Sequence, residues 1–277
     1  MNKVSKNFIL GAIIGDISGS RFEFNPIKSK NFELLPTKEQ QSFNENGLFC
    51  TFTDDTIMTI AIANALLDSK GDLKSVSQLA IKNMKYFGNK YPLAGYGARF
   101  YSWLHMSTTE PYNSYGNGSA MRISAVPYFA KNLDEVKLLS KLVTEVTHNH
   151  PEGIKGAETT AICIWLALNG YSKEHIKKYV EDNYYKLDFN YENLVKNYTF
   201  DESCQNSVPQ SIFAFIISNS YEDAIKTAIS MGGDADTMAC IAGGIAAAYY
   251  GLSKDLEEKG LKFLPEEFKK IISQFKI

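Results

Sequence analysis

The stretch TMACIAGGIAAAYYGLS, residues 237–253, carries no formal charge and consists largely of alanine, glycine and other apolar residues. It is slightly short for a membrane span, which needs about 20 apolar residues, and two acids, Asp234 and Asp236, lie just before it. A helix that is apolar on nearly every side belongs in the interior of a protein. We therefore predict a tightly packed core helix over Met238–Tyr250.

Helical periodicity continues along the rest of the chain. Ile57–Leu67 is also apolar nearly all round, whereas Leu133–Val143 has the mixed pattern of a surface helix. The only strand candidate, Ser124–Phe129, is too short and contains Pro127, and no linker or repeat divides the chain. The sequence therefore predicts one all-α domain over residues 1–277, a compact multi-helix orthogonal bundle. Its further helices are expected at Asp54–Leu67, Val76–Phe87, Asp134–Val146, Ile154–Leu168, Lys173–Glu181, Ser211–Ser218, Tyr221–Ile229 and Glu266–Gln274.

Composition places the chain among ordinary folded proteins. Of its 277 residues, 44% are hydrophobic and 22% are charged, which excludes a disordered chain. The formal net charge of −2 argues against a protein that holds nucleic acid on a basic surface. The cysteines form no C-x-x-C pair, which favours buried or free thiols in a reducing compartment over a zinc site or a disulfide framework. They are Cys50, Cys163, Cys204 and Cys240.

The apolar run Phe8–Gly15 has some features of a signal peptide. Asp16 follows it directly, however, and no cleavage site of small residues is apparent. We therefore expect a cytoplasmic protein that is neither secreted nor associated with a membrane.

Two acidic clusters, Thr53–Thr56 and Gly232–Thr237, precede apolar helices. Thr and Asp commonly cap helix starts, so capping explains either cluster taken alone. One carboxylate is enough for a cap, however, and two acidic pairs directed at a core would repel unless a cation lay between them. Carboxylate and hydroxyl oxygens suit Mg²⁺, with Mn²⁺ as a substitute, whereas zinc would call for His or Cys. If the clusters meet in space, their carboxylates could neutralise two such ions.

Five short motifs follow one another along the chain: Gly15-Asp16 with Glu23, Phe52–Thr56, Tyr115–Arg122, Thr147-His148 and Gly232–Thr237. This series, from about Leu10 to Gly251, resembles the ADP-ribosylglycohydrolase family, which includes the dinitrogenase-reductase-activating glycohydrolases. The resemblance implies an all-α bundle with two magnesium ions in a cleft. It also implies hydrolysis of the bond between ADP-ribose and an attached group.

The resemblance further implies roles for single residues. The matching metal ligands are Thr53, Asp54, Asp55, Asp234, Asp236 and Thr237. The loop that holds the diphosphate is matched by Ser114, Tyr115, Gly116, Asn117 and Gly118, and His148 matches a histidine near the phosphates. Some members carry an aspartate just before this loop, but Pro111–Ser114 contains no acid. Glu23 matches an acid above the metals, and we assign the proton chemistry to Glu23 and Asp55.

Several residues keep two interpretations. Asn117-Gly118 suits an ordinary tight turn or a loop whose N–H groups bind phosphate. Met121 could equally well pack against the nucleotide or against the core. Tyr115 could stack on adenine or merely cover the loop. Arg122 could face phosphate or form a buried ion pair, and we predict the ion pair. His148 suits a structural role or a contact with the ligand. Asp16 is predicted to be a structural acceptor near the site. Surface packing, rather than a substrate rim, is predicted for Tyr184, Tyr185, Tyr191 and Tyr198.

The expected reaction is cleavage at the anomeric carbon of the distal ribose, through a transition state that resembles an oxocarbenium ion. Divalent ions would orient the ribose hydroxyls and activate a water molecule, and a carboxylate would move the proton. The expected partner is an ADP-ribosylated protein side chain or a small ADP-ribose conjugate. Two alternatives stay open: a non-catalytic ADP-ribose binder, and a toxin-immunity protein that acts by contact. The complete set of metal-ligand residues favours the hydrolase.

Overall fold

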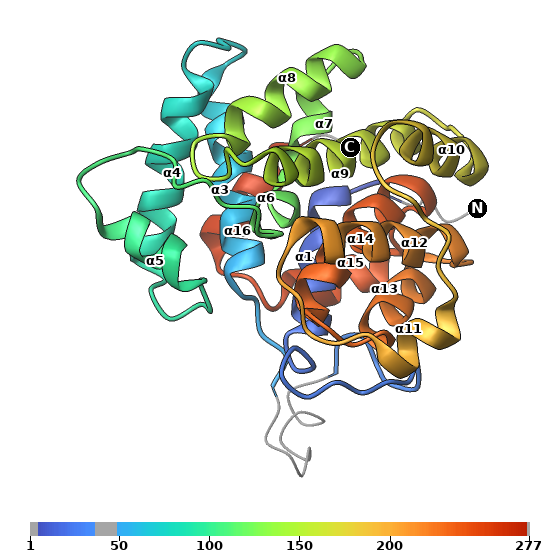
Figure 1. The fold of residues 1–277 in the computed structure, drawn as a ribbon. Coiled ribbons are helices and arrows are strands. Elements are labelled where there is room, and N and C mark those ends of the chain that lie inside the picture. The colour runs from blue at the N-terminus through green and yellow to red at the C-terminus, as the bar shows by residue number, and fades with distance from the viewer. Residues whose placement is uncertain (1–4, 37–48, 276–277) are drawn as a thin grey trace.

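The computed structural model describes residues 5–36 and 49–275. Within these ranges the chain forms helices and no β-strand, apart from the isolated bridges Ser5–Leu252 and Gly116–Ser203. The predicted all-α fold is therefore confirmed. The helices (Figure 1) are α1 Phe8–Gly19, α3 Asp54–Ser69, α4 Val76–Lys90, α5 Ala98–His105, α6 Gly118–Met121, the 3₁₀ helix η1 Ile123–Ala125, α7 Val126–Phe129, α8 Leu133–Thr144, α9 Pro151–Leu168, α10 Lys173–Asn183, α11 Tyr191–Asn197, α12 Cys204–Ile217, α13 Tyr221–Ser230, α14 Ala235–Tyr250, α15 Lys254–Leu261 and α16 Glu266–Ile272.

Helices α1 and α14 pack against each other at the centre of the fold (Figure 1). Gly15 and Gly19 lie four residues apart on α1 and therefore share one face of the helix. A Cβ atom at Gly15 would lie 2.1 Å from the Ala239 carbonyl oxygen, and one at Gly19 would lie 2.4 Å from Cα of Asp236. Only glycine allows two backbones to approach this closely. The close approach places the end of α1, with Asp16, beside the beginning of α14.

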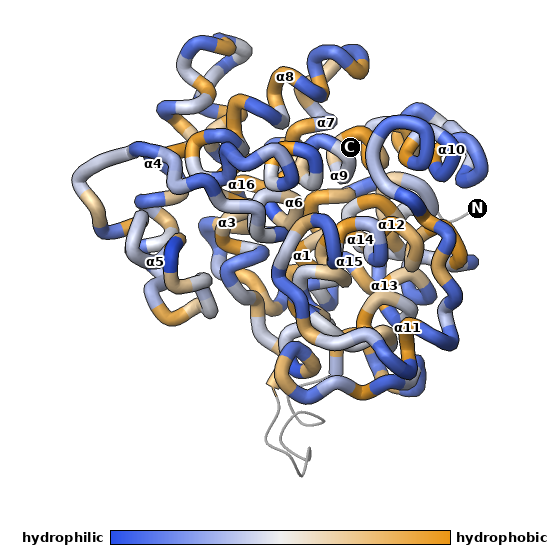
Figure 2. The backbone as a smooth tube through the Cα atoms, in the orientation of Figure 1, coloured by the Kyte–Doolittle hydropathy of each residue, from blue (hydrophilic) through white to orange (hydrophobic). Residues whose placement is uncertain are grey.

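The predicted core helix over Met238–Tyr250 is confirmed as α14, and its residues from Ala235 to Ala248 are all buried. Hydrophilic residues are frequent along the peripheral helix α10, whereas hydrophobic residues predominate along α12 (Figure 2). Among the residues that the structure describes, no helix is long and apolar enough to cross a membrane.

Helix α1 is absent from the sequence prediction. All 12 of its residues are buried, so it has no polar face that would mark it as an amphipathic helix. Helix α12 begins at Cys204 rather than at Ser211 and contains Pro209, a residue that sequence reasoning takes as a helix boundary. The short helices α5, α11 and α15 were not predicted either.

Candidate active site

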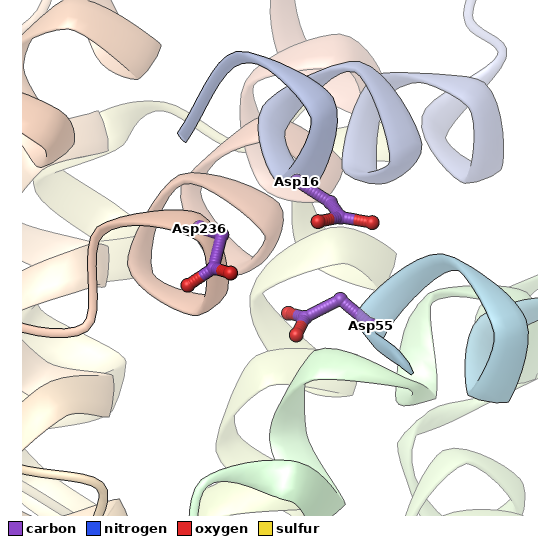
Figure 3. A group of neighbouring side chains, drawn as sticks. All are labelled: Asp16, Asp55 and Asp236. Atoms are coloured by element: carbon purple, nitrogen blue, oxygen red, sulfur yellow. The ribbon is translucent and has the colours of Figure 1, made fainter. Parts of the chain in front are cut away.

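The two acidic clusters meet at the beginnings of α3 and α14. One carboxylate oxygen from each of Asp16, Asp55 and Asp236 lies within 4.8 Å of the others. Figure 3 shows these carboxylates directed toward a common space from α1, α3 and α14. In a second group, one carboxylate oxygen from each of Glu23, Asp234 and Asp236 likewise lies within 4.8 Å of the others. The sequence identified both clusters, and the packing of α1 against α14 and α3 brings them together.

Asp16 is the structural acceptor that the sequence predicted. Its Oδ1 accepts a hydrogen bond from Thr53 Oγ1 at 2.7 Å, and its Oδ2 accepts from the backbone N–H groups of Thr53 at 3.0 Å and Thr56 at 3.1 Å. A carboxylate that accepts helix N–H groups stabilises the beginning of that helix. Asp16 therefore fixes the start of α3 and, with it, the position of Asp55.

The acidic cluster is electrostatically unfavourable without a cation. Burial raises the pKa values of Asp55 and Asp236 well above their usual range, and the neighbouring carboxylates raise them further. Burial likewise raises the pKa of Asp16 to about 6, and burial with the charge of Asp234 raises the pKa of Glu23 to about 7. In the described part of the chain, no lysine or arginine forms an ion pair with these acids.

The donor set fits a hard divalent cation. Asp55 Oδ1 is buried and has no hydrogen-bond partner among the described residues. Its other oxygen, Oδ2, accepts a hydrogen bond from Thr237 Oγ1 at 3.1 Å. A buried carboxylate oxygen without a partner is costly. Carboxylate and hydroxyl oxygens gathered in one place are the ligands that Mg²⁺ and Mn²⁺ prefer.

A cavity of about 380 Å³ opens above this cluster. Glu23 and the acidic cluster line it, and so do Ser114–Gly118, Met121 and His148. Every site residue predicted from the sequence lines this cavity except Thr53, whose hydroxyl is bonded to Asp16. The structure thus gathers residues from widely separated segments around one space.

The loop over the cavity makes a turn at Asn117 and Gly118, as one of its two interpretations predicted. Asn117 has φ −68° and ψ −10°, it directly precedes α6, and the Ser119 N–H donates to the Gly116 carbonyl oxygen at 3.5 Å. The N–H of Gly116 donates to Ser114 Oγ at 3.2 Å, and the N–H of Asn117 donates to the Glu202 carbonyl oxygen at 2.8 Å. These two backbone donors already have partners. The loop therefore offers a ligand fewer free N–H groups than a phosphate-binding nest would.

The predicted ion pair of Arg122 is wrong. Its guanidinium is buried, but it donates to Thr147 Oγ1 at 2.8 Å and to the Val143 carbonyl oxygen at 3.4 Å, and no described carboxylate pairs with it. Met121 meets both of its interpretations, because it is buried and also lines the cavity. Tyr115 is exposed and meets the His150 ring edge-on, with the ring centroids 5.2 Å apart.

The four remaining tyrosines do not line the cavity. Tyr184 donates to Glu158, and Tyr191 bonds to Ser230 Oγ at 2.7 Å. Tyr198 donates to the Asn206 carbonyl oxygen, and Tyr185 is buried. Packing is therefore the better interpretation of this group, as the sequence predicted.

Sequence reasoning missed several residues around the cavity. They are Gly95, Gly97, Arg99, Phe100, Tyr112, Phe200 and Glu202. It also missed Lys28, whose Nζ donates to the carbonyl oxygens of Tyr198 at 2.7 Å and Met231 at 2.6 Å and so ties the loop after α1 to the segment before Asp234. No local pattern marks these residues, because they meet through contacts between distant segments.

Comparisons with known proteins agree with this geometry. A family model described as ADP-ribosylglycohydrolase matches residues 5–274. The chain is 26% identical over 311 residues to the mouse ADP-ribosylhydrolase ARH3, and the alignment covers 89% of this chain and 83% of the mouse protein. It is 25% identical over 282 residues to the ADP-ribosylarginine hydrolase Tri1 of Pseudomonas putida, and this alignment covers 90% of this chain and 71% of that protein. A solved structure titled "ADP-ribosylglycohydrolase-related protein complex" superposes with a TM-score of 0.69 at 22% identity, over 96% of this chain and 94% of the other.

Proposed function

The chain belongs to the ADP-ribosylglycohydrolase family and is a hydrolase that removes ADP-ribose from modified acceptors, and on this premise we propose that it is Mg²⁺-dependent and cleaves the glycosidic bond at the distal ribose. The modified acceptor is a protein side chain. The free cysteines support a reducing compartment and therefore a cytoplasmic site of action.

The observation that carries the metal dependence is the group of buried carboxylates that face one another, with one Asp55 oxygen unpartnered. The residues that would hold the ions are Thr53, Asp54, Asp55, Asp234, Asp236 and Thr237. When bound, Mg²⁺ supplies charge that orients ribose hydroxyls and makes a water molecule easier to deprotonate. Mn²⁺ is the expected substitute because it accepts the same oxygen ligands.

Glu23 is the carboxylate best placed to move a proton. It lines the cavity, is half-buried, and lies beside Asp234 and Asp236. Burial and the charge of Asp234 raise the pKa of Glu23 in the cation-free protein, and a carboxyl group in this position can accept a proton and release it again. Asp55 is the second acid at the reacting end. The cluster aspartates Asp54, Asp234 and Asp236 mainly hold the cations in this proposal.

The loop Ser114–Gly118 would hold the diphosphate of ADP-ribose. This loop and His148 line the same cavity as the acidic cluster. Binding energy from this part of the substrate would position the glycosidic bond over the cluster.

The test is a panel of ADP-ribose conjugates incubated with the protein and Mg²⁺. The panel contains peptides ADP-ribosylated on arginine or on serine, an ADP-ribosylated oligonucleotide and O-acetyl-ADP-ribose, and free ADP-ribose is quantified by chromatography. We expect release from a modified peptide, strongly reduced in Asp236→Asn and unchanged in the control Asp188→Asn, an exposed acid away from the cavity. Binding of ADP-ribose without release from any conjugate would favour the non-catalytic binder.

A further inference from the structure

Arg122 is a buried cation without an anionic partner. Its side chain is only 1% exposed, and no carboxylate of the described residues pairs with it. A buried charge that lacks an opposite charge is expensive. Arg122 also lines the cavity, as Gly116 and His148 do. Its charge is therefore in place before any ligand arrives.

A chain of two hydrogen bonds leads from Arg122 to His148. Arg122 Nη2 lies 2.8 Å from Thr147 Oγ1, and Thr147 Oγ1 lies 2.8 Å from His148 Nδ1. A guanidinium has donors only, so Thr147 must accept the first bond. No other acceptor for the Thr147 hydroxyl hydrogen occurs among the hydrogen bonds of the described residues, so this hydrogen is directed to Nδ1. Nδ1 is then the acceptor, and Nε2 of the neutral ring carries the proton.

The other ring nitrogen, Nε2, faces the loop over the cavity. A Cβ atom at Gly116 would lie 3.7 Å from His148 Nε2, and one at Gly118 would lie 3.5 Å from it. Burial, together with the charges of Arg122 and Arg99, lowers the pKa of His148 well below its usual value, so the ring stays neutral. A neutral histidine can donate from Nε2 only in this tautomer.

We propose that Arg122 and Thr147 are positioning residues that hold His148 in its Nε2–H tautomer, so that His148 donates a hydrogen bond to the diphosphate bound at the Gly116–Gly118 loop. This inference rests on the proposed function, because the diphosphate is that of ADP-ribose. In the opposite tautomer, Nε2 would carry no hydrogen, and its lone pair would face the negatively charged diphosphate. The Arg122 charge acts in the same direction as the donor, because Arg122 lines the same cavity and its positive charge attracts the same anion.

The experiment reads the tautomer directly. The protein is labelled with ¹⁵N-histidine, and the ring-nitrogen chemical shifts measured by NMR distinguish a protonated Nε2 from a protonated Nδ1. The signal of His148 is assigned by its absence from the spectrum of His148→Asn. We expect protonated Nε2 in the wild-type protein without ligand and a mixture of tautomers in Thr147→Val, which keeps the shape of the side chain and removes the hydroxyl. The calorimetric affinity for ADP-ribose should fall roughly 10–100-fold in Thr147→Val, the scale of a hydrogen bond to a charged group. Thr147→Ser should restore both readouts.

Thr227→Val is the matched control, because Thr227 is also buried with a bonded hydroxyl but lies away from the cavity. It should leave the His148 spectrum and the ADP-ribose affinity unchanged. A protonated Nδ1 in the wild-type protein would overturn the inference, even if Thr147→Val fails to fold. Unchanged ADP-ribose affinity in a folded Thr147→Val protein would also overturn it. A normal wild-type spectrum together with no ADP-ribose binding would instead overturn the proposed function.

Discussion

Asn117 and Asp234 are joined by a hydrogen bond in which Asn117 Nδ2 donates to Asp234 Oδ2 at 2.7 Å. Asn117 lies in the loop over the cavity, and Asp234 lies in the acidic cluster. The bond therefore couples the segment that would hold the diphosphate to a segment that would hold the cation. A displacement of one segment is passed directly to the other.

Asn117→Ala should weaken the binding of both ligands, the cation and ADP-ribose. The substitution removes a hydrogen bond to a carboxylate, worth about 1.5–3 kcal/mol, and leaves Asp234 less firmly placed. We expect lower calorimetric affinity for both Mg²⁺ and ADP-ribose. Asn183→Ala, which removes a similar amide hydrogen bond on the exposed side of α10, should change neither. Normal affinity for both ligands in Asn117→Ala would show that the two segments are independent.

Glu23→Gln should slow turnover while leaving ligand binding largely intact. Glutamine keeps the shape of the side chain but cannot accept a proton near neutral pH. Turnover should fall by roughly 10²–10⁴-fold, the usual scale for general acid–base catalysis. Affinity for ADP-ribose should change far less, because the diphosphate would contact the loop and His148 rather than Glu23. Near-normal turnover of Glu23→Gln would show that Glu23 does not move the proton and would assign this role to Asp55.

The stability of the cation-free protein should fall as pH rises. The folded-state pKa values are raised, to about 6 for Asp16 and about 7 for Glu23, from ordinary values of 3.8 and 4.5. Between those limits the folded protein binds more protons than the unfolded chain, so the free energy of unfolding decreases from about pH 4 to about pH 7. Bound Mg²⁺ removes the repulsion between the ionised carboxylates.

Thermal unfolding at pH 5 and pH 8, with and without Mg²⁺, measures this linkage. The increase in Tm caused by Mg²⁺ should be larger at pH 8, because more carboxylates are then ionised and able to bind the cation. An equal increase at the two pH values would argue against a cation at this cluster.

Gly15→Ala should destabilise the fold. The added Cβ would lie 2.1 Å from the Ala239 carbonyl oxygen, which belongs to the backbone of α14 and cannot move aside as a side chain would. We expect a loss of at least roughly 1–3 kcal/mol in the free energy of unfolding, measured by urea denaturation. Gly97→Ala adds the same atom where nothing lies within 4 Å and is the control. Equal stability of the two variants would contradict the close packing of α1 and α14.

The sequence predicted the parts of this fold that depend on local patterns. The uncharged stretch that forms α14 and the two acidic clusters are visible as composition and spacing. Helix α1 was missed because a helix buried on every side lacks the periodicity that reveals a surface helix. Its glycines are informative only once α14 is known to pack against them.

The error at Arg122 has the same origin. Arg122 was expected to find a carboxylate, but its partners are the Thr147 hydroxyl and a backbone carbonyl that long-range folding supplies. The Asn117-Gly118 dipeptide forms a turn, as its composition suggests, but its contacts with Glu202 and Asp234 come from distant segments. Local propensity cannot anticipate either arrangement, because each depends on which distant segments meet.

The metal dependence is tested by measuring the release of ADP-ribose from a modified peptide in excess chelator, followed by the addition of Mg²⁺. Wild-type protein and Asp55→Asn are compared side by side. We expect no release by the wild-type protein in chelator and full recovery with Mg²⁺. Asp55→Asn should show weaker Mg²⁺ binding and a strongly reduced rate even at saturating peptide, because a ligand of the cation is lost. Equal release by the wild-type protein in chelator and in Mg²⁺ would contradict the claim that the buried acidic cluster acts through a divalent cation.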